Sequence, residues 1–184
     1  MLPIPFSFDT LTYSVPKVGD AFGGGFIAYI YQESDDQYDP YYTSIYVGPY
    51  SKDIIRGIII STASIANSQL GPGSSLPATN RSGAQSTTTL YNWDSTSTLA
   101  ASRVETLTFN GFTDWFIPSR YEMLQIVSLT FSRQYMTQSE YWTTDTNAGS
   151  GLAYGIDTVT WTSGLANSTN SFGVRAFRYF TIYT

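Results

Sequence analysis

The sequence contains no cysteine and no histidine, and only 12% of its 184 residues are charged. The absence of cysteine excludes a disulfide framework, a thiolate metal site and a thiol nucleophile. The absence of histidine excludes the Ser-His-Asp triad and His-based metal chemistry. Chemistry based on paired carboxylates remains open for an enzyme of this composition.

Basic side chains are also scarce. Nine basic residues against fourteen acidic ones give a net charge of −5, and only two of the nine are lysines. Without a basic stripe the chain cannot neutralise the phosphates of a nucleic acid. No apolar run is long enough to span a bilayer. We therefore expect neither a nucleic-acid partner nor membrane insertion.

The N-terminal segment MLPIPFSFDTLTYSVP does not resemble a secretory leader. It has no basic n-region and no continuous apolar region, and prolines stand where a signal helix would lie. Aromatic residues make up 16% of the chain, while serine, threonine, asparagine and glycine fill most of the rest, which is typical of an extracellular or virion β-protein. A surface-type protein without a leader fits a phage particle, because phages are assembled in the cytoplasm and released by lysis.

The most informative segment of the chain, DWFIPSRYEML at residues 114–124, predicts a short apolar strand that passes directly into a capped amphipathic helix. Ser119 and Glu122 have the S-x-x-E spacing of a capping box. The helix is predicted from residue 120 to about 130. Its inward-facing side chains are expected to be Met123, Leu124, Val127 and Phe131.

Other patterns predict an α+β chain in which two helices precede a mainly antiparallel, β-rich half. An earlier helix is expected around residues 99–107, with its cap among residues 95–97 and its end at Asn110-Gly111. A long loop is expected at residues 67–91. Strands are expected at 22–32 and 54–62, paired in one sheet, and then near 141–144, 152–156, 159–162 and 174–180.

Several of these segments occur in the order and rough spacing of a known family. They are Gly23-Gly24-Gly25 with FIAYIY, then TDWFIPSRYEML, then EYWTT and finally GVRAFRYF. On these segments the chain resembles the Lcl C-terminal-like family, C-type-lectin-like domains of bacterial and phage surface proteins, over residues 18–180. The resemblance implies a C-type-lectin-like fold with long loops, here residues 18–184, and a binding role without a reaction. Residues 1–17, with three prolines, are expected to be an extended attachment arm.

Metal binding is not expected. C-type lectins that bind calcium use an E-P-N or Q-P-D tripeptide with a W-N-D triplet, and neither tripeptide is present. Asn92-Trp93-Asp94 has the letters of the triplet in another order, and we interpret it as a helix-entry motif. The acidic cluster Asp35, Asp36 and Asp39 lacks the glycine and the final glutamate of an EF-hand loop, which favours a solvated turn. No cofactor is expected.

Candidate binding residues come from aromatic side chains. Tyrosine offers a large amphipathic contact area at low entropic cost, so a tyrosine-rich segment suits either a ligand surface or packing against another subunit. Both interpretations stay open. The candidates are Tyr38, Tyr41, Tyr42, Tyr46, Tyr50 and Trp93.

Other prominent side chains are expected to be structural. Trp115 and Trp142, like Trp161, lie in predicted strands and are assigned to the core. Arg175 and Arg178 are three residues apart in the last predicted strand, which places them on opposite faces. Glu122 is the expected partner of one of them.

Together these patterns predict a non-enzymatic phage virion protein. We expect a decoration or tail-attached accessory protein that attaches to other virion subunits through residues 1–17 and mediates adhesion to the host surface. One alternative is a dedicated receptor-binding tip that recognises a host glycan or protein, and another is a secreted bacterial adhesin domain. A homo-oligomer is also compatible with the tyrosine-rich segment, and a carboxylate-dependent glycan hydrolase is the enzymatic alternative.

Overall fold

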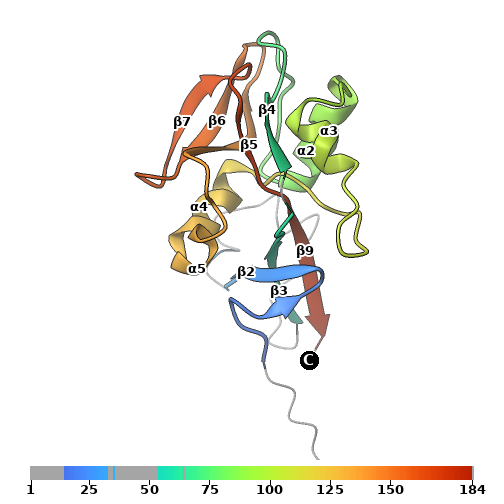
Figure 1. The fold of residues 1–184 in the computed structure, drawn as a ribbon, viewed down its shortest axis with the longest axis vertical. Helices are drawn as coiled ribbons and strands as arrows, with labels where there is room; N and C mark the ends of the chain where they lie inside the picture. The colour runs from blue at the N-terminus through green and yellow to red at the C-terminus, as the bar shows by residue number, and fades with distance from the viewer. Residues whose placement is uncertain (1–14, 33–34, 36–53, 64, 184) are drawn as a thin grey trace, which may run out of the picture.

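The computed structural model describes residues 15–32, 35, 54–63 and 65–183. Within them the chain forms two β-sheets and four helices, so the predicted α+β class is confirmed (Figure 1). Most of the expected arm, the tyrosines at 38–50 and the acids at 36 and 39 lie outside the described residues. None of the described helices has the length and apolar character needed to cross a membrane.

A four-stranded antiparallel sheet has the strand order β1-β2-β3-β9. Its strands are β1 (Ala21–Phe22), β2 (Gly25–Ile30), β3 (Ile54–Ile60) and β9 (Phe177–Tyr183). The β-branched run of β3 pairs with β2 on one side and β9 on the other, as predicted for the first two apolar strands. The single strand expected at 22–32 is instead a hairpin, because Gly23 and Gly24 reverse the chain at φ values of +53° and +85°.

A five-stranded sheet has the order β4-β8-β5-β6-β7. Its strands are β4 (Ile65–Ser68), β5 (Glu140–Asn147), β6 (Leu152–Asp157), β7 (Thr162–Asn167) and β8 (Phe172–Val174). The prediction of a strand at 159–162 is wrong. The chain turns there because the Asp157 carboxylate accepts the N–H groups of Val159 and Thr160. The strand expected at 174–180 is split between β8 and β9 at Arg175-Ala176.

Helix α2 (Gly83–Trp93) occupies much of the segment expected to be a loop. The pattern was misleading because the buried face of α2 carries hydroxyls, Ser86 and Thr87, with only one large apolar side chain, Leu90. The Thr87 hydroxyl donates to the Gly83 carbonyl at 2.8 Å and accepts the N–H of Ile117 at 2.9 Å, so its burial is compensated. Asn92-Trp93-Asp94 therefore ends a helix and does not begin one.

Helix α3 (Ala100–Glu105) lies where a helix was predicted, but its boundaries differ. Its N-cap is Leu99, which makes no side-chain capping bond, so the caps expected among residues 95–97 are wrong. Asn110-Gly111 does not stop this helix either. Both residues have positive φ, +50° and +81°, and they form the turn of a small hairpin bridged at Phe109 and Phe112.

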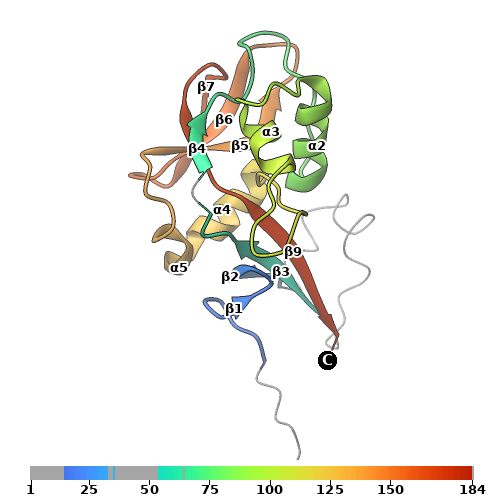
Figure 2. The same ribbon diagram turned by 45° about the vertical axis from the view of Figure 1, so that its right-hand side comes forward.

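Helix α4 (Arg120–Ser128) has the capping box at Ser119 and Glu122, and the short helix α5 (Thr130–Arg133) follows it. In both views α4 lies between the two sheets (Figures 1 and 2). Its Met123 and Val127 are buried, as expected for inward-facing positions, while Leu124 and Phe131 are only partly buried. The buried apolar residues of the described chain form two clusters, and α4 belongs to the second.

Candidate functional site

The β1–β2 hairpin, residues 21–26, presents a turn that only glycine can form. A Cβ atom on Gly24 would lie 2.6 Å from the Phe112 ring, and one on Gly25 would lie 2.2 Å from the backbone oxygen of Ile60. Gly23 and Gly24 also have left-handed backbone conformations. The glycine triplet therefore lets this hairpin sit directly against β3 and the 109–112 hairpin.

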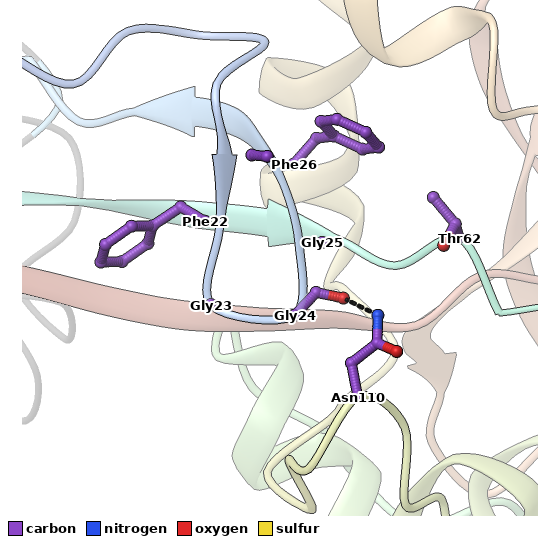
Figure 3. Close-up of a pocket in the computed structure, with 8 residues that line it drawn as sticks. Phe22, Gly23, Gly24, Gly25, Phe26, Thr62 and Asn110 are labelled. Carbon is purple, nitrogen blue, oxygen red and sulfur yellow. Dashed lines mark hydrogen bonds between the residues drawn. The ribbon is translucent and has the colours of Figure 1, made fainter.

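Two side chains fix the turn in place. Asn110 donates from Nδ2 to the Gly24 carbonyl at 2.8 Å (Figure 3). Arg178 on β9 donates from Nη1 to the Gly23 carbonyl at 2.9 Å and stacks 3.8 Å from the centre of the Phe112 ring. The same guanidinium binds both oxygens of Asp114, at 2.8 and 2.7 Å. A bidentate, charge-assisted pair of this kind holds the arginine in one orientation.

Two open hollows adjoin this turn. The first, of about 460 Å³, is lined by residues 21–26, Thr62 and Asn110 (Figure 3). The second, also about 460 Å³, is lined by Phe22, Gly23, Phe112 and residues 178–181. Phe22 belongs to both, and 40% of it is exposed although its ring packs 5.4 Å from that of Phe180.

Two polar side chains, Asn110 and Thr62, also line the first hollow. Asn110 uses its amide nitrogen for Gly24, and within the described part of the chain its Oδ1 makes no hydrogen bond. The Thr62 hydroxyl is exposed and likewise has no hydrogen bond there. A concave surface with an exposed ring and a few polar groups can hold a small ligand by stacking and hydrogen bonding. This arrangement supplies binding contacts.

The residues predicted for ligand binding lie elsewhere. Trp93 is the last residue of α2 and 38% of it is exposed, so it is accessible, but α2 is at the other end of the molecule from β1 and β2 (Figures 1 and 2). The five tyrosines lie outside the described residues. The structure therefore does not bring Trp93 together with the glycine hairpin.

The residues predicted to be structural lie within the framework. Trp115 and Trp142 are 2% and 0% exposed, and the Trp142 indole donates to the Ser68 carbonyl at 2.8 Å. Trp161, in contrast, lies in a turn with φ +56°, is only partly buried and stacks under Arg133. The predicted strand at Trp161 is therefore wrong, because the chain turns before β7 begins, but the ring still packs against the second core cluster.

Arg175 and Arg178 contact different partners, neither of them the expected one, and Arg175 lies between β8 and β9 and not in a strand. Arg178 binds Asp114, while Arg175 donates to the backbone carbonyls of Ala63 and Tyr135. Glu122 is fully buried and accepts from the N–H groups of Ser119 and Gly83 and from the Tyr179 hydroxyl. The expected Glu122–arginine contact is wrong, because the helix starts and Tyr179 bind this carboxylate.

Carboxylates in the described residues do not gather into a metal site. No group of three or more acidic side chains lies close enough together there to hold an ion. Asp35, from the acidic cluster, accepts from the Tyr29 hydroxyl at 3.0 Å and the Gln125 amide at 3.2 Å. Burial, with the charge of Asp35, raises the pKa of the Tyr29 hydroxyl above its ordinary value.

The main features of this site, the turn at Asn110-Gly111 and the Arg178–Asp114 pair, were not predicted from the sequence. Asn110-Gly111 is the commonest dipeptide of a tight hairpin, and that signal was available but was interpreted as a helix end. The pairing of Arg178 with Asp114 spans 64 residues and leaves no local pattern. The chain matches no family model and no curated protein. The resemblance to the Lcl C-terminal-like family therefore stays a prediction.

Proposed function

We propose that the protein is a non-enzymatic, C-type-lectin-like module of a phage virion, a decoration or tail-attached accessory protein that mediates adhesion to the host surface. The observation that carries this proposal is the glycine hairpin. It exposes an aromatic ring beside two open hollows while hydrogen bonds from Asn110 and Arg178 hold its backbone. A surface fixed before binding loses little conformational entropy when a ligand docks.

The C-type-lectin-like fold is part of the same proposal. It is supported by the order of elements, in which helices precede the β-rich half, and by the last strand, β9, returning to pair with the early strand β3. The capping box at Ser119 opens the helix between the two sheets. These features fit the family resemblance.

A non-enzymatic role is supported by how the described carboxylates are used. Glu122 binds two helix starts, Asp114 binds Arg178, and Asp157 binds the N–H groups of a turn. Glycoside hydrolysis needs an acid and a second carboxylate on opposite sides of a sugar. A reducing-end assay on purified polysaccharides tests this point, and release of new ends would contradict it.

The main experiment compares two aromatic residues of nearly equal exposure. Purified protein with Phe22→Ala, Asn110→Ala or Trp93→Ala is tested for binding to a glycan array and to purified bacterial envelope fractions. We expect Phe22→Ala and Asn110→Ala to weaken binding by roughly tenfold, because each removes a contact from the hollow. Trp93→Ala is expected to bind as the wild type does.

The opposite pattern would place the binding surface at the end of α2. Wild-type protein that binds neither probe, yet sediments with virions, would contradict adhesion and leave decoration as the role. Thermal melts of each variant separate lost binding from lost folding. Phe22→Leu serves as a second variant because it keeps an apolar contact with Phe180 while removing the ring.

A further inference from the structure

Arginine side chains stacked on aromatic rings form a second feature, along α4, α5 and the five-stranded sheet. The guanidinium carbon of Arg120, the first residue of α4, lies 4.4 Å from the centre of the Tyr154 ring on β6. That of Arg133, the last residue of α5, lies 4.7 Å from the centre of the Trp161 ring. Such stacking fixes the plane of a guanidinium without using its N–H groups.

A second contact fixes each arginine through its Nε atom. Nε of Arg120 donates to the Ser163 hydroxyl at 2.7 Å, and Nε of Arg133 donates to the Val127 carbonyl at 2.7 Å. Among the described residues neither side chain forms an ion pair, and the terminal Nη atoms make no hydrogen bond. Both side chains are partly exposed. Two oriented guanidinium groups therefore keep their outer donors unused.

These two groups belong to one region of the surface. Trp161 and Ser163, which they contact, are two residues apart, so their Cα atoms are at most about 7 Å from each other. Leu165, 48% exposed, is the register partner of Tyr154 across β6 and β7. The surrounding surface therefore carries an exposed apolar side chain as well as the Ser163 hydroxyl.

Acidic groups nearby are already engaged by backbone donors. Asp145 on β5 accepts the backbone N–H of Arg120, and burial raises the pKa of its carboxyl above the ordinary value. Asp157 accepts the N–H groups of Val159 and Thr160. Neither carboxylate lies within 4.0 Å of the Arg120 or Arg133 guanidinium. An external anion therefore meets no ion pair within 4.0 Å that it must displace, although the charges of Asp145 and Arg120 act on each other over a longer distance.

We propose that Arg120 and Arg133 form a binding site for a polysaccharide that carries carboxylate or phosphate groups. The planar fork of each arginine matches two oxygens of such a group. Because the whole chain carries a net charge of −5, bulk attraction does not favour a polyanion, and recognition must come from these oriented groups. The site is separate from the glycine hairpin and does not depend on the function proposed there.

Three polymers test this site with the full chain. Binding of polygalacturonate, which carries carboxylates, dextran phosphate and unmodified dextran is measured by biolayer interferometry at low salt. We expect at least one of the two anionic polymers to bind and dextran not to bind. Which of the two binds more tightly identifies the anionic group. Failure of both, or equal binding of dextran, would overturn the proposal.

Variants then locate the contact. Arg120→Gln and Arg133→Gln, made one at a time, should each weaken binding of the anionic polymer by about tenfold, the loss expected for charge-assisted hydrogen bonds. Arg103→Gln is the matched control, because Arg103 on α3 also donates from Nε, to the Thr98 carbonyl, but has no stacked ring among the described residues. This control should change binding by less than about twofold. Equal losses in the three single variants would show that net charge alone matters, and the proposal would be wrong.

Arg120→Lys keeps the charge and removes the planar fork. We expect it to bind several-fold more weakly than wild type. Its melting temperature is measured beside that of Arg103→Gln, so that misfolding is recognised independently of binding. A folded Arg120→Lys protein that binds as tightly as wild type would contradict recognition by an oriented guanidinium.

Discussion

An inner strand of the four-stranded sheet, β3, buries three consecutive isoleucines, Ile58, Ile59 and Ile60. The central strand of the five-stranded sheet, β5, buries Thr143 next to Tyr141 and Trp142. Burial of isoleucine is favourable by itself, whereas a buried hydroxyl or indole N–H must find an acceptor. The second sheet accordingly depends on side-chain to backbone hydrogen bonds, such as those from Thr143 to Tyr154 and from Trp142 to Ser68.

The largest test of this contrast is at Trp142. Trp142→Ala should lower the free energy of unfolding by about 3 to 5 kcal/mol, because it removes the largest fully buried side chain among the described residues. Trp142→Phe should still cost about 1 to 3 kcal/mol, since it leaves the Ser68 carbonyl without its donor. Urea unfolding measures both. A Phe variant as stable as wild type would show that packing alone holds this sheet.

Two glycines give the next comparison. Gly25→Ala on β2 should cost about 3 kcal/mol or more, because its Cβ would lie 2.2 Å from the Ile60 oxygen and would separate β2 from β3. Gly164→Ala on β7 meets no atom within 4 Å and should be neutral or stabilise by about 0.5 kcal/mol. Urea unfolding of both variants distinguishes them, and equal effects would contradict the close approach of β2 to β3.

Smaller effects are expected at the helix between the sheets. Ser119→Ala should cost about 1 kcal/mol, because the N–H of Glu122 loses its acceptor. Ser97→Ala is the control, since Ser97 is exposed and was expected to cap α3 but does not. It should change stability by less than about 0.5 kcal/mol. Thermal melts can compare the two, and a similar loss at both positions would speak against a specific cap at α4.

The smallest expected effects concern pH and come from the five-stranded sheet. Burial raises the pKa of Asp145, so its contribution to stability is complete below the ordinary aspartate pKa and is lost as pH rises through the raised value. Hydrogen bonds from Thr160 and Val159 lower the pKa of Asp157, so its contribution is present above the ordinary pKa and is lost as pH falls through the lowered value.

Two variants distinguish these opposite dependences of stability on pH. Asp145→Asn should flatten the decline in stability on going from acid toward neutral pH. Asp157→Asn should flatten the decline in stability in strong acid. It should leave the change in stability from acid toward neutral pH as it is in the wild type. Melting temperatures across a pH series provide the measurement. Identical pH profiles for Asp145→Asn and wild type would mean that this carboxyl does not titrate differently on folding.

The same contrast explains which elements could be predicted. The β-branched run of β3 and the capping box at Ser119 are local signals, and both elements were found. Helix α2 was missed because Thr87 is buried through a hydrogen bond to Ile117, 30 residues away, and such a partner leaves no periodic pattern. The hollow beside Gly24 was missed for the same reason, because Asn110 contacts it across 86 residues.

Glu122 has a consequence for the order in which the chain folds. Its carboxylate accepts the N–H of Ser119 at 2.7 Å and that of Gly83 at 3.0 Å, so it lies at the starts of both α4 and α2. The first contact is local, but the second closes a segment of 39 residues and is formed only after that loop's entropy has been lost. Because α2 is threonine-rich and a weak helix former on its own, we expect it to form late. Folding kinetics should accordingly give high φ-values in α4 and low φ-values in α2.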